Sequence, residues 1–261
     1  MKLAALLTTV SHPQKQEWLM QVVVNLESLD LKFDKKIISV DKIHGYEFSK
    51  QLQSDIERLG WEFSFVEFGN RPKTLLPELL KLHNYDYILY AEDDILINWC
   101  PDVALLNNLL SYKIDNKSCG ILTPSAGGST FKCEGGDTGD FDFIERETIY
   151  ENANLLVFKR LEEFASSWFF ELGTIFIKPI LFYNCLKKSV EELPGTQIEQ
   201  GLTVSWFNLG YHESFFKATF CRPCIKQLYK EYPQLVDPVC KFMSILDPYA
   251  GDSRFGGSHH L

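Results

Sequence analysis

The sequence predicts an α/β fold built on a mostly parallel sheet with helices on its faces. As far as residue 91, short apolar runs alternate with longer amphipathic segments. Strands that alternate with helices require crossover connections, which generate parallel sheets and place ligands beyond the carboxyl ends of the strands. The composition agrees, because 45% hydrophobic and 23% charged residues are ordinary globular values that exclude a disordered or fibrous chain. With 261 residues, the chain can bury a sizeable core.

Periodicity places each element of the first half. The first apolar run, from Leu3, is typical of a buried strand, and the apolar spacing after Ser11, a candidate cap, predicts a helix. In chain order we expect a strand at 3–9, a helix at 13–29, a strand at 36–40 ending at Asp41, a helix at 48–59 closed by Gly60, a strand at 61–68, a helix at 74–82 and a strand at 85–91.

The second half, after Pro101, has a different character. Residues 125–142 hold five glycines and few aliphatic side chains, which predicts a long loop. Such a loop is either a lid or binding segment or a plain surface loop. Around it we expect helices at 102–112, 180–186 and 199–209, the last closed by Gly210, and strands at 120–124, 155–158 and 174–177.

Charge, hydropathy and cysteine content narrow the class of protein. The formal net charge of -9 and a pI near 5.2 argue against a broad nucleic-acid surface. The N-terminal apolar stretch is interrupted by Thr8 and Thr9 and reads as a buried strand, not as a signal peptide or membrane span. Seven scattered cysteines favour reduced thiols and a cytoplasmic protein. The locally basic C-terminal stretch is either a solvated face or a contact for an anionic acceptor or a membrane surface.

The most informative segment is the acidic triplet Glu92-Asp93-Asp94, which follows a buried run at 85–91. Three like charges at the end of a strand repel one another, and a divalent cation among them relieves that repulsion. Oxygen ligands alone suit Mg²⁺ or Mn²⁺. The other reading of such a triplet is a turn or a solvated helix start.

This order of elements, with its acidic triplet, resembles the GT-A-fold glycosyltransferases of the family-2 type. The triplet, followed by Ile95, is similar to the E-D-D form of their DXD motif. The resemblance implies a divalent ion that bridges the diphosphate of a nucleotide sugar. It makes Asp94 the direct metal ligand, Asp93 a residue that faces the donor and shares the metal, and Glu92 a further donor-binding residue. It also implies that residues 1–100 form the nucleotide-sugar half of one domain and residues 101–261 the acceptor half with a C-terminal extension.

Four more residues fall where such enzymes line the donor site. Thr8 and Thr9 end the first strand, Asp41 ends the second, and Arg71 follows the third. The resemblance implies contacts with the nucleotide for all four. Without it, an aspartate at a strand end is a turn former and an arginine after a strand is usually solvated.

A second carboxylate, Glu199, matches the position of the catalytic base when Leu202 is placed on the leucine of the family pattern. Inverting transfer needs a base for the acceptor hydroxyl, and a helix N-terminus keeps a carboxylate ionised. The usual Glu-Asp pair reads Ile198-Glu199 here, and an ordinary acid at a helix start is the alternative. His212 either completes the metal shell or is a hydrogen-bonded structural residue.

The expected function is therefore a metal-dependent, inverting glycosyltransferase using Mn²⁺ or Mg²⁺. Its expected donor is a nucleoside-diphosphate sugar, a UDP-sugar first, and its acceptor a saccharide or lipid-linked glycan of bacterial-type surface polysaccharide or glycoconjugate synthesis. We expect it in the cytoplasm or at the inner face of the membrane. The alternatives are an inactive carbohydrate-binding protein of this fold and a nucleotidyltransferase, although residues 8–13 lack the glycine-rich basic loop of the latter class.

Overall fold

The computed structural model describes residues 1–67, 71–93, 102–104, 106–107, 113–114, 117–118, 121–123, 146–151, 155–160, 174–192 and 214–216. Asp94, Glu199, His212 and the glycine-rich segment 125–142 lie outside these residues. The elements are β1 (Leu3–Val10), α1 (Pro13–Glu27), β2 (Lys35–Lys42), α2 (Lys50–Arg58), β3 (Glu62–Glu67), α3 (Arg71–Lys81), β4 (Tyr87–Glu92), β5 (Lys113–Ile114), β6 (Lys117–Ser118), β7 (Ile121–Thr123), β8 (Arg146–Glu151), β9 (Leu155–Arg160), β10 (Thr174–Ile177), α5 (Pro179–Glu192) and β11 (Ser214–Phe216).

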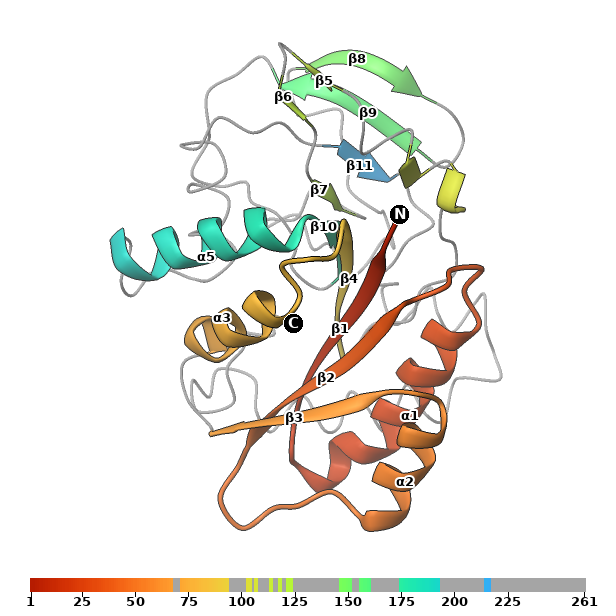
Figure 1. Ribbon diagram of the computed structural model, residues 1–261, viewed down its shortest axis with the longest axis vertical. Helices are drawn as coiled ribbons and strands as arrows, with labels where there is room; N and C mark the ends of the chain where they lie inside the picture. Colours follow the sequence, from red (N-terminus) through yellow and green to blue (C-terminus); the bar gives the residue numbers. More distant parts are fainter. Residues whose placement is uncertain are drawn as a thin grey trace, which may run out of the picture.

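One large sheet organises the molecule (Figure 1). Its strand order is β3-β2-β1-β4-β10-β7-β11-β9-β8, and β5 pairs with β6 in a separate ladder. The block β3-β2-β1-β4 is entirely parallel, because α1, α2 and α3 supply the crossovers. β10, from the second half of the chain, joins β4 in the antiparallel sense and extends the same sheet. The predicted α/β class, with a parallel sheet flanked by helices, is confirmed.

The two faces of β1 bury different helices, as the period of a strand requires. Leu3, Ala5 and Leu7 pack with the apolar side chains of α1 and α2, whereas Ala4 and Leu6 pack with those of α3 and α5. Figure 1 shows α1 and α2 together on one side of the sheet, and α3 and α5 together on the other. Because both faces are covered, β1 is buried along nearly its whole length. Its carboxyl end is held rigidly in the middle of the parallel block.

The boundaries of the helices differ from those the sequence predicts: α1 ends two residues early, at Glu27, and α5 continues six residues further, to Glu192. α2 begins at Lys50 because the hydroxyl of Ser49 caps it, accepting a hydrogen bond from the Leu52 N–H. The turn after α2 contains Gly60 at φ +84°, the left-handed conformation that glycine adopts readily, so the predicted stop is confirmed. α3 begins at Arg71, three residues before the predicted start.

The second half contributes helix α5 and short strands. The strands predicted at 155–158 and 174–177 are present as β9 and β10. Cys185 of α5 is a free, buried thiol, and burial raises its pKa to about 12, which leaves it unreactive at neutral pH. Within the part of the chain that the structure describes, no helix is both long and apolar enough to cross a membrane.

Candidate functional site at the carboxyl edge of the parallel sheet

Three parallel strands end side by side and carry most of the candidate donor-site residues. In the pairing register, Thr8 of β1 lies opposite Glu92 of β4, and Val10 of β1 lies opposite Asp41 of β2. The chain leaves β1 towards β2 on one side and returns to β4 on the other. The gap between β1 and β4 is therefore the switch point of the sheet, where open α/β sheets bind their ligands.

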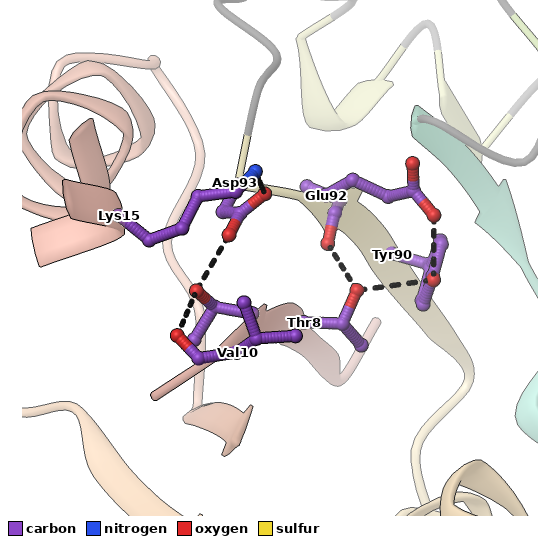
Figure 2. Close-up of polar contacts among 8 residues, drawn as sticks. Thr8, Val10, Lys15, Tyr90, Glu92 and Asp93 are labelled. Carbon is purple, nitrogen blue, oxygen red and sulfur yellow. Dashed lines mark hydrogen bonds and ion pairs between the residues drawn. The ribbon is translucent and has the colours of Figure 1, made fainter. Parts of the chain in front are cut away.

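Asp93, directly after β4, is enclosed by two donors (Figure 2). The hydroxyl of Thr9 donates to its Oδ2 at 2.6 Å, and the ammonium of Lys15 donates to its Oδ1 at 2.9 Å. Lys15 lies in the first turn of α1. Only 4% of Asp93 and 5% of Lys15 are exposed. The pair is thus a buried salt bridge that joins the start of α1 to the end of β4.

Glu92 and Thr8 lie on the opposite face of the sheet. The Thr8 hydroxyl hydrogen-bonds the Tyr90 hydroxyl at 3.1 Å and approaches the Ala91 carbonyl at 3.5 Å. The Tyr90 hydroxyl in turn donates to Glu92 Oε1 at 3.4 Å (Figure 2). The Tyr90 ring packs edge-on against Phe182 of α5, with ring centroids 5.4 Å apart. Tyr90 therefore aligns Thr8 and Glu92 on the α3–α5 face.

Glu92, the last residue of β4, and Asp93, the next residue, consequently direct their carboxylates to opposite faces of the sheet. The side chain of Glu92 is on the side of Tyr90, and that of Asp93 is on the side of α1. Asp93 begins the turn that follows the strand. The two carboxylates therefore have different partners, although they are consecutive in the sequence.

Asp41 belongs to the same edge, one strand further along. It is 5% exposed, and its carbonyl accepts a hydrogen bond from the Ser11 N–H at 3.0 Å. The Ser11 hydroxyl accepts from the Ile43 N–H at 2.8 Å. Ser11, which we expected to cap α1, thus uses its hydroxyl to tie the loop after β1 to the end of β2.

His12 and Tyr46 form an aromatic pair beside this loop. Their ring centroids are 4.9 Å apart, His12 is 8% exposed and Tyr46 is 42% exposed. Burial lowers the pKa of His12 below its ordinary value of 6.5, and the charge of Lys15 lowers it further. The imidazole is therefore predominantly neutral at pH 7.

The structure brings together five of the predicted site residues: Thr8, Thr9, Asp41, Glu92 and Asp93. Arg71 is the first residue of α3, and its side chain is outside the description. Asp94, Glu199 and His212 are also outside it.

Sequence reasoning missed Lys15, His12 and Tyr90. One signal was available for Lys15, because a lysine in the first turn of a helix opposes the helix dipole.

The carboxylates offer oxygen ligands, which are the kind that Mg²⁺ and Mn²⁺ prefer. Among the residues with described positions, no three His, Cys, Asp or Glu side chains are grouped so that they could hold a metal ion. Mg²⁺ commonly needs only one or two carboxylates, because substrate phosphates and water complete its shell. Glu92 is half-buried and offers a carboxylate suited to that mode of binding.

Comparisons with known proteins support the fold. No family model matches the chain, and no curated protein matches it. The crystal structure of S. aureus TarS 1-349 is similar with a TM-score of 0.53 and 15% identity, covering 88% of this chain and 63% of TarS 1-349. The crystal structure of TarS 1-349 in complex with UDP-GlcNAc gives a TM-score of 0.51 and 14% identity, covering 84% of this chain and 57% of that one.

At this level of identity the likeness is one of fold. The chain has an α/β fold of the GT-A-like class and spans 63% of the length of the TarS fragment.

Proposed function

We propose that this protein is a metal-dependent glycosyltransferase that moves a sugar from a nucleoside-diphosphate sugar to a saccharide or lipid-linked acceptor. One observation carries the proposal: five polar residues lie along the carboxyl edge of a GT-A-like sheet, at or directly after the ends of β1, β2 and β4 and around its switch point. Open α/β sheets bind ligands at that place. The similarity to TarS, whose structure includes a complex with UDP-GlcNAc, favours a UDP-sugar as the donor.

Each residue has a proposed role on the donor side. Asp41 and the threonines of β1 contact the nucleotide, with Arg71 reaching it from the start of α3. Asp94 holds a Mn²⁺ or Mg²⁺ ion, which when bound neutralises the charge of the diphosphate leaving group. Glu92, whose carboxylate accepts a hydrogen bond from the Tyr90 hydroxyl, is a further proposed contact for the donor.

On the acceptor side, Glu199 is the proposed base. A carboxylate there takes the proton from the acceptor hydroxyl as that oxygen attacks the anomeric carbon, opposite the leaving diphosphate. This geometry inverts the configuration of the sugar. His212 is a proposed additional metal ligand.

Thermal unfolding with a panel of nucleoside diphosphates and their sugars tests the donor site. A ligand that binds only the native state, at 100 times its Kd, adds about 2.7 kcal/mol of stability. We expect stabilisation by UDP or a UDP-sugar with Mn²⁺ or Mg²⁺, and its loss in EDTA. The variant Asp94→Asn should lose the stabilisation. A matched control is Asp86→Asn at the opposite end of β4, where the carboxylate accepts from the Lys2 N–H.

Two outcomes contradict the proposal. Stabilisation by none of the nucleotides overturns the donor site, and an unchanged response in Asp94→Asn overturns the metal ligand. The base has a separate test. Glu199→Gln should retain the nucleotide-dependent stabilisation but lose sugar transfer, which is measured by the release of UDP. Equal turnover in Glu199→Gln and the wild type rules out that role.

The acceptor and the location belong to the same proposal. We place the reaction in the cytoplasm, with peripheral contact at the inner face of the membrane where the acceptor is lipid-linked. UDP release measured with soluble glycans and with glycolipids in anionic vesicles distinguishes the two acceptor classes.

A further inference from the structure

A lysine at position 15 is energetically unfavourable for two reasons. It is 5% exposed, so its ammonium is removed from water, and it lies at the N-terminal turn of α1, where the helix dipole disfavours a positive charge. Its salt bridge to Asp93 offsets these costs. Buried ion pairs can often be replaced by apolar residues without loss of stability, so stability alone does not account for this pair.

The partner of Lys15 is the central residue of the acidic triplet. Both oxygens of Asp93 accept hydrogen bonds from within the protein, at 2.6 Å from Thr9 and 2.9 Å from Lys15. These bonds turn the carboxylate towards α1 and away from the face that Glu92 occupies. For Asp93 to coordinate a metal ion, one of these two hydrogen bonds would have to break.

We infer that Lys15 is a positioning residue that holds Asp93 out of the metal-ligand set and cancels its charge at the strand end. The inference rests on the proposed function and assigns the divalent ion to carboxylates other than Asp93. With one carboxylate neutralised, the protein attracts the free ion weakly, and the diphosphate of the donor supplies the missing ligands and charge. The metal and the nucleotide therefore bind together, and little metal binds alone.

A charge-conserving double variant tests the inference. Lys15→Met with Asp93→Asn removes one positive and one negative charge, and each new side chain is similar in size to the one it replaces. Free Mn²⁺, measured by electron paramagnetic resonance, gives the Mn²⁺ Kd of the full chain with and without UDP. If Asp93 is not a ligand, the double variant binds Mn²⁺ with UDP within about threefold of the wild type. A loss of more than about tenfold means that Asp93 is a ligand and overturns the inference.

The single variant Lys15→Met provides a readout that a purely structural role would not change. It frees the Asp93 carboxylate, so we expect Mn²⁺ binding without UDP to tighten by about tenfold, whereas Lys15→Arg should behave as the wild type. A folded Lys15→Met with unchanged Mn²⁺ affinity contradicts the inference. If the single variant does not fold, the double variant decides alone.

A matched control and the wild type complete the experiment. The double variant Lys36→Met with Glu27→Gln removes a similar pair at the other end of α1 and should leave Mn²⁺ and UDP binding unchanged. A wild type that binds neither Mn²⁺ nor UDP overturns the proposed function, and this inference with it. A wild type that binds both, together with a double variant at Lys15 and Asp93 that loses Mn²⁺, overturns the inference alone.

Discussion

Helix α1 has a lysine–carboxylate pair at each end, and the two pairs share their N–O distance but differ in burial and surroundings. Lys15 and Asp93 at its start, and Lys36 and Glu27 at its end, each have an N–O separation of 2.9 Å. The side chains of the first pair are 7% and 6% exposed, whereas those of the second are 17% and 30% exposed. The first pair lies at the carboxyl edge of the parallel sheet, the second at the amino edge of β2.

The surroundings of the two pairs explain the difference. Glu27 also accepts a hydrogen bond from the buried Trp61 indole at 2.7 Å, and Lys36 donates to the carbonyl of Leu59 after α2. These contacts fasten the end of α1 to the turn between α2 and β3. By contrast, the partners of Asp93 are side chains at the carboxyl edge of the sheet, where open α/β folds in general bind their ligands. The position of an ion pair relative to the strand ends thus separates a structural link from a site residue more clearly than its geometry does.

The largest expected effect is that of breaking the buried pair from one side. Lys15→Met leaves Asp93 as an uncompensated buried charge, which typically costs about 3–5 kcal/mol. Urea denaturation should show that loss in the free energy of unfolding. Adding Asp93→Asn should recover most of it, because no buried charge then remains. A single variant as stable as the wild type would mean that water reaches Asp93 and that the pair is not buried in solution.

Trp61→Phe tests the structural link at the other end of α1. The ring is 1% exposed and remains buried, but the indole N–H that binds Glu27 is lost. A hydrogen bond to a charged group contributes about 1.5 kcal/mol, so we expect a loss of that order in urea denaturation. UDP binding in the presence of Mn²⁺ should not change. A change in UDP affinity would show that the two ends of α1 are coupled.

Lys36→Met should have a smaller effect. Its pair with Glu27 is partly exposed to water, and pairs of this kind contribute about 0.5–1 kcal/mol. The loss should shrink further at high salt, because mobile ions screen the wild-type interaction. Urea denaturation at low and at high ionic strength measures the loss of unfolding free energy and its dependence on salt. A cost equal to that of Lys15→Met would remove the distinction drawn between the two pairs.

The sequence predicted the elements of the parallel block because each is long enough to show its period. It also placed the polar residues Thr8, Asp41 and Glu92 at strand ends, where periodic runs stop. One signal pointed to Lys15, its unfavourable position in the first turn of a helix, but its partner lies 78 residues away and could not be predicted from the sequence. The opposite directions of Glu92 and Asp93 could not be predicted either, because β4 ends at Glu92 and Asp93 begins the turn that follows.

The second half was less predictable for a physical reason. β8, with the sequence RETIYE, has charged residues at both ends, and β11 is only three residues long. Neither provides the apolar run or the repeated alternation that identifies a strand. Both are strands because neighbours in the sheet pair with them: β8 with β9, and β11 with β7 and β9.

The smallest expected effect is a pH dependence from His12, which also reports on the charge of Lys15. Burial, and then Lys15, lowers the pKa of His12 below 6.5, so the unfolded state binds more protons between the two pKa values. The contribution of His12 to stability is therefore complete above pH 6.5 and is lost as the pH falls through the folded-state pKa. Replacing His12 with glutamine should flatten this part of the profile of unfolding free energy against pH.

The double variant Lys15→Met with Asp93→Asn, which leaves the net charge unchanged, separates the two causes of the lowered His12 pKa, burial and the charge of Lys15. It removes the smaller cause, so the pKa of His12 should rise towards 6.5 but stay below it, because burial remains. Nuclear magnetic resonance titration of the His12 ring protons measures this shift. A pKa that does not rise would mean that the ammonium of Lys15 does not act on the ring, and hence that its charge is already fully balanced by Asp93 in the wild type.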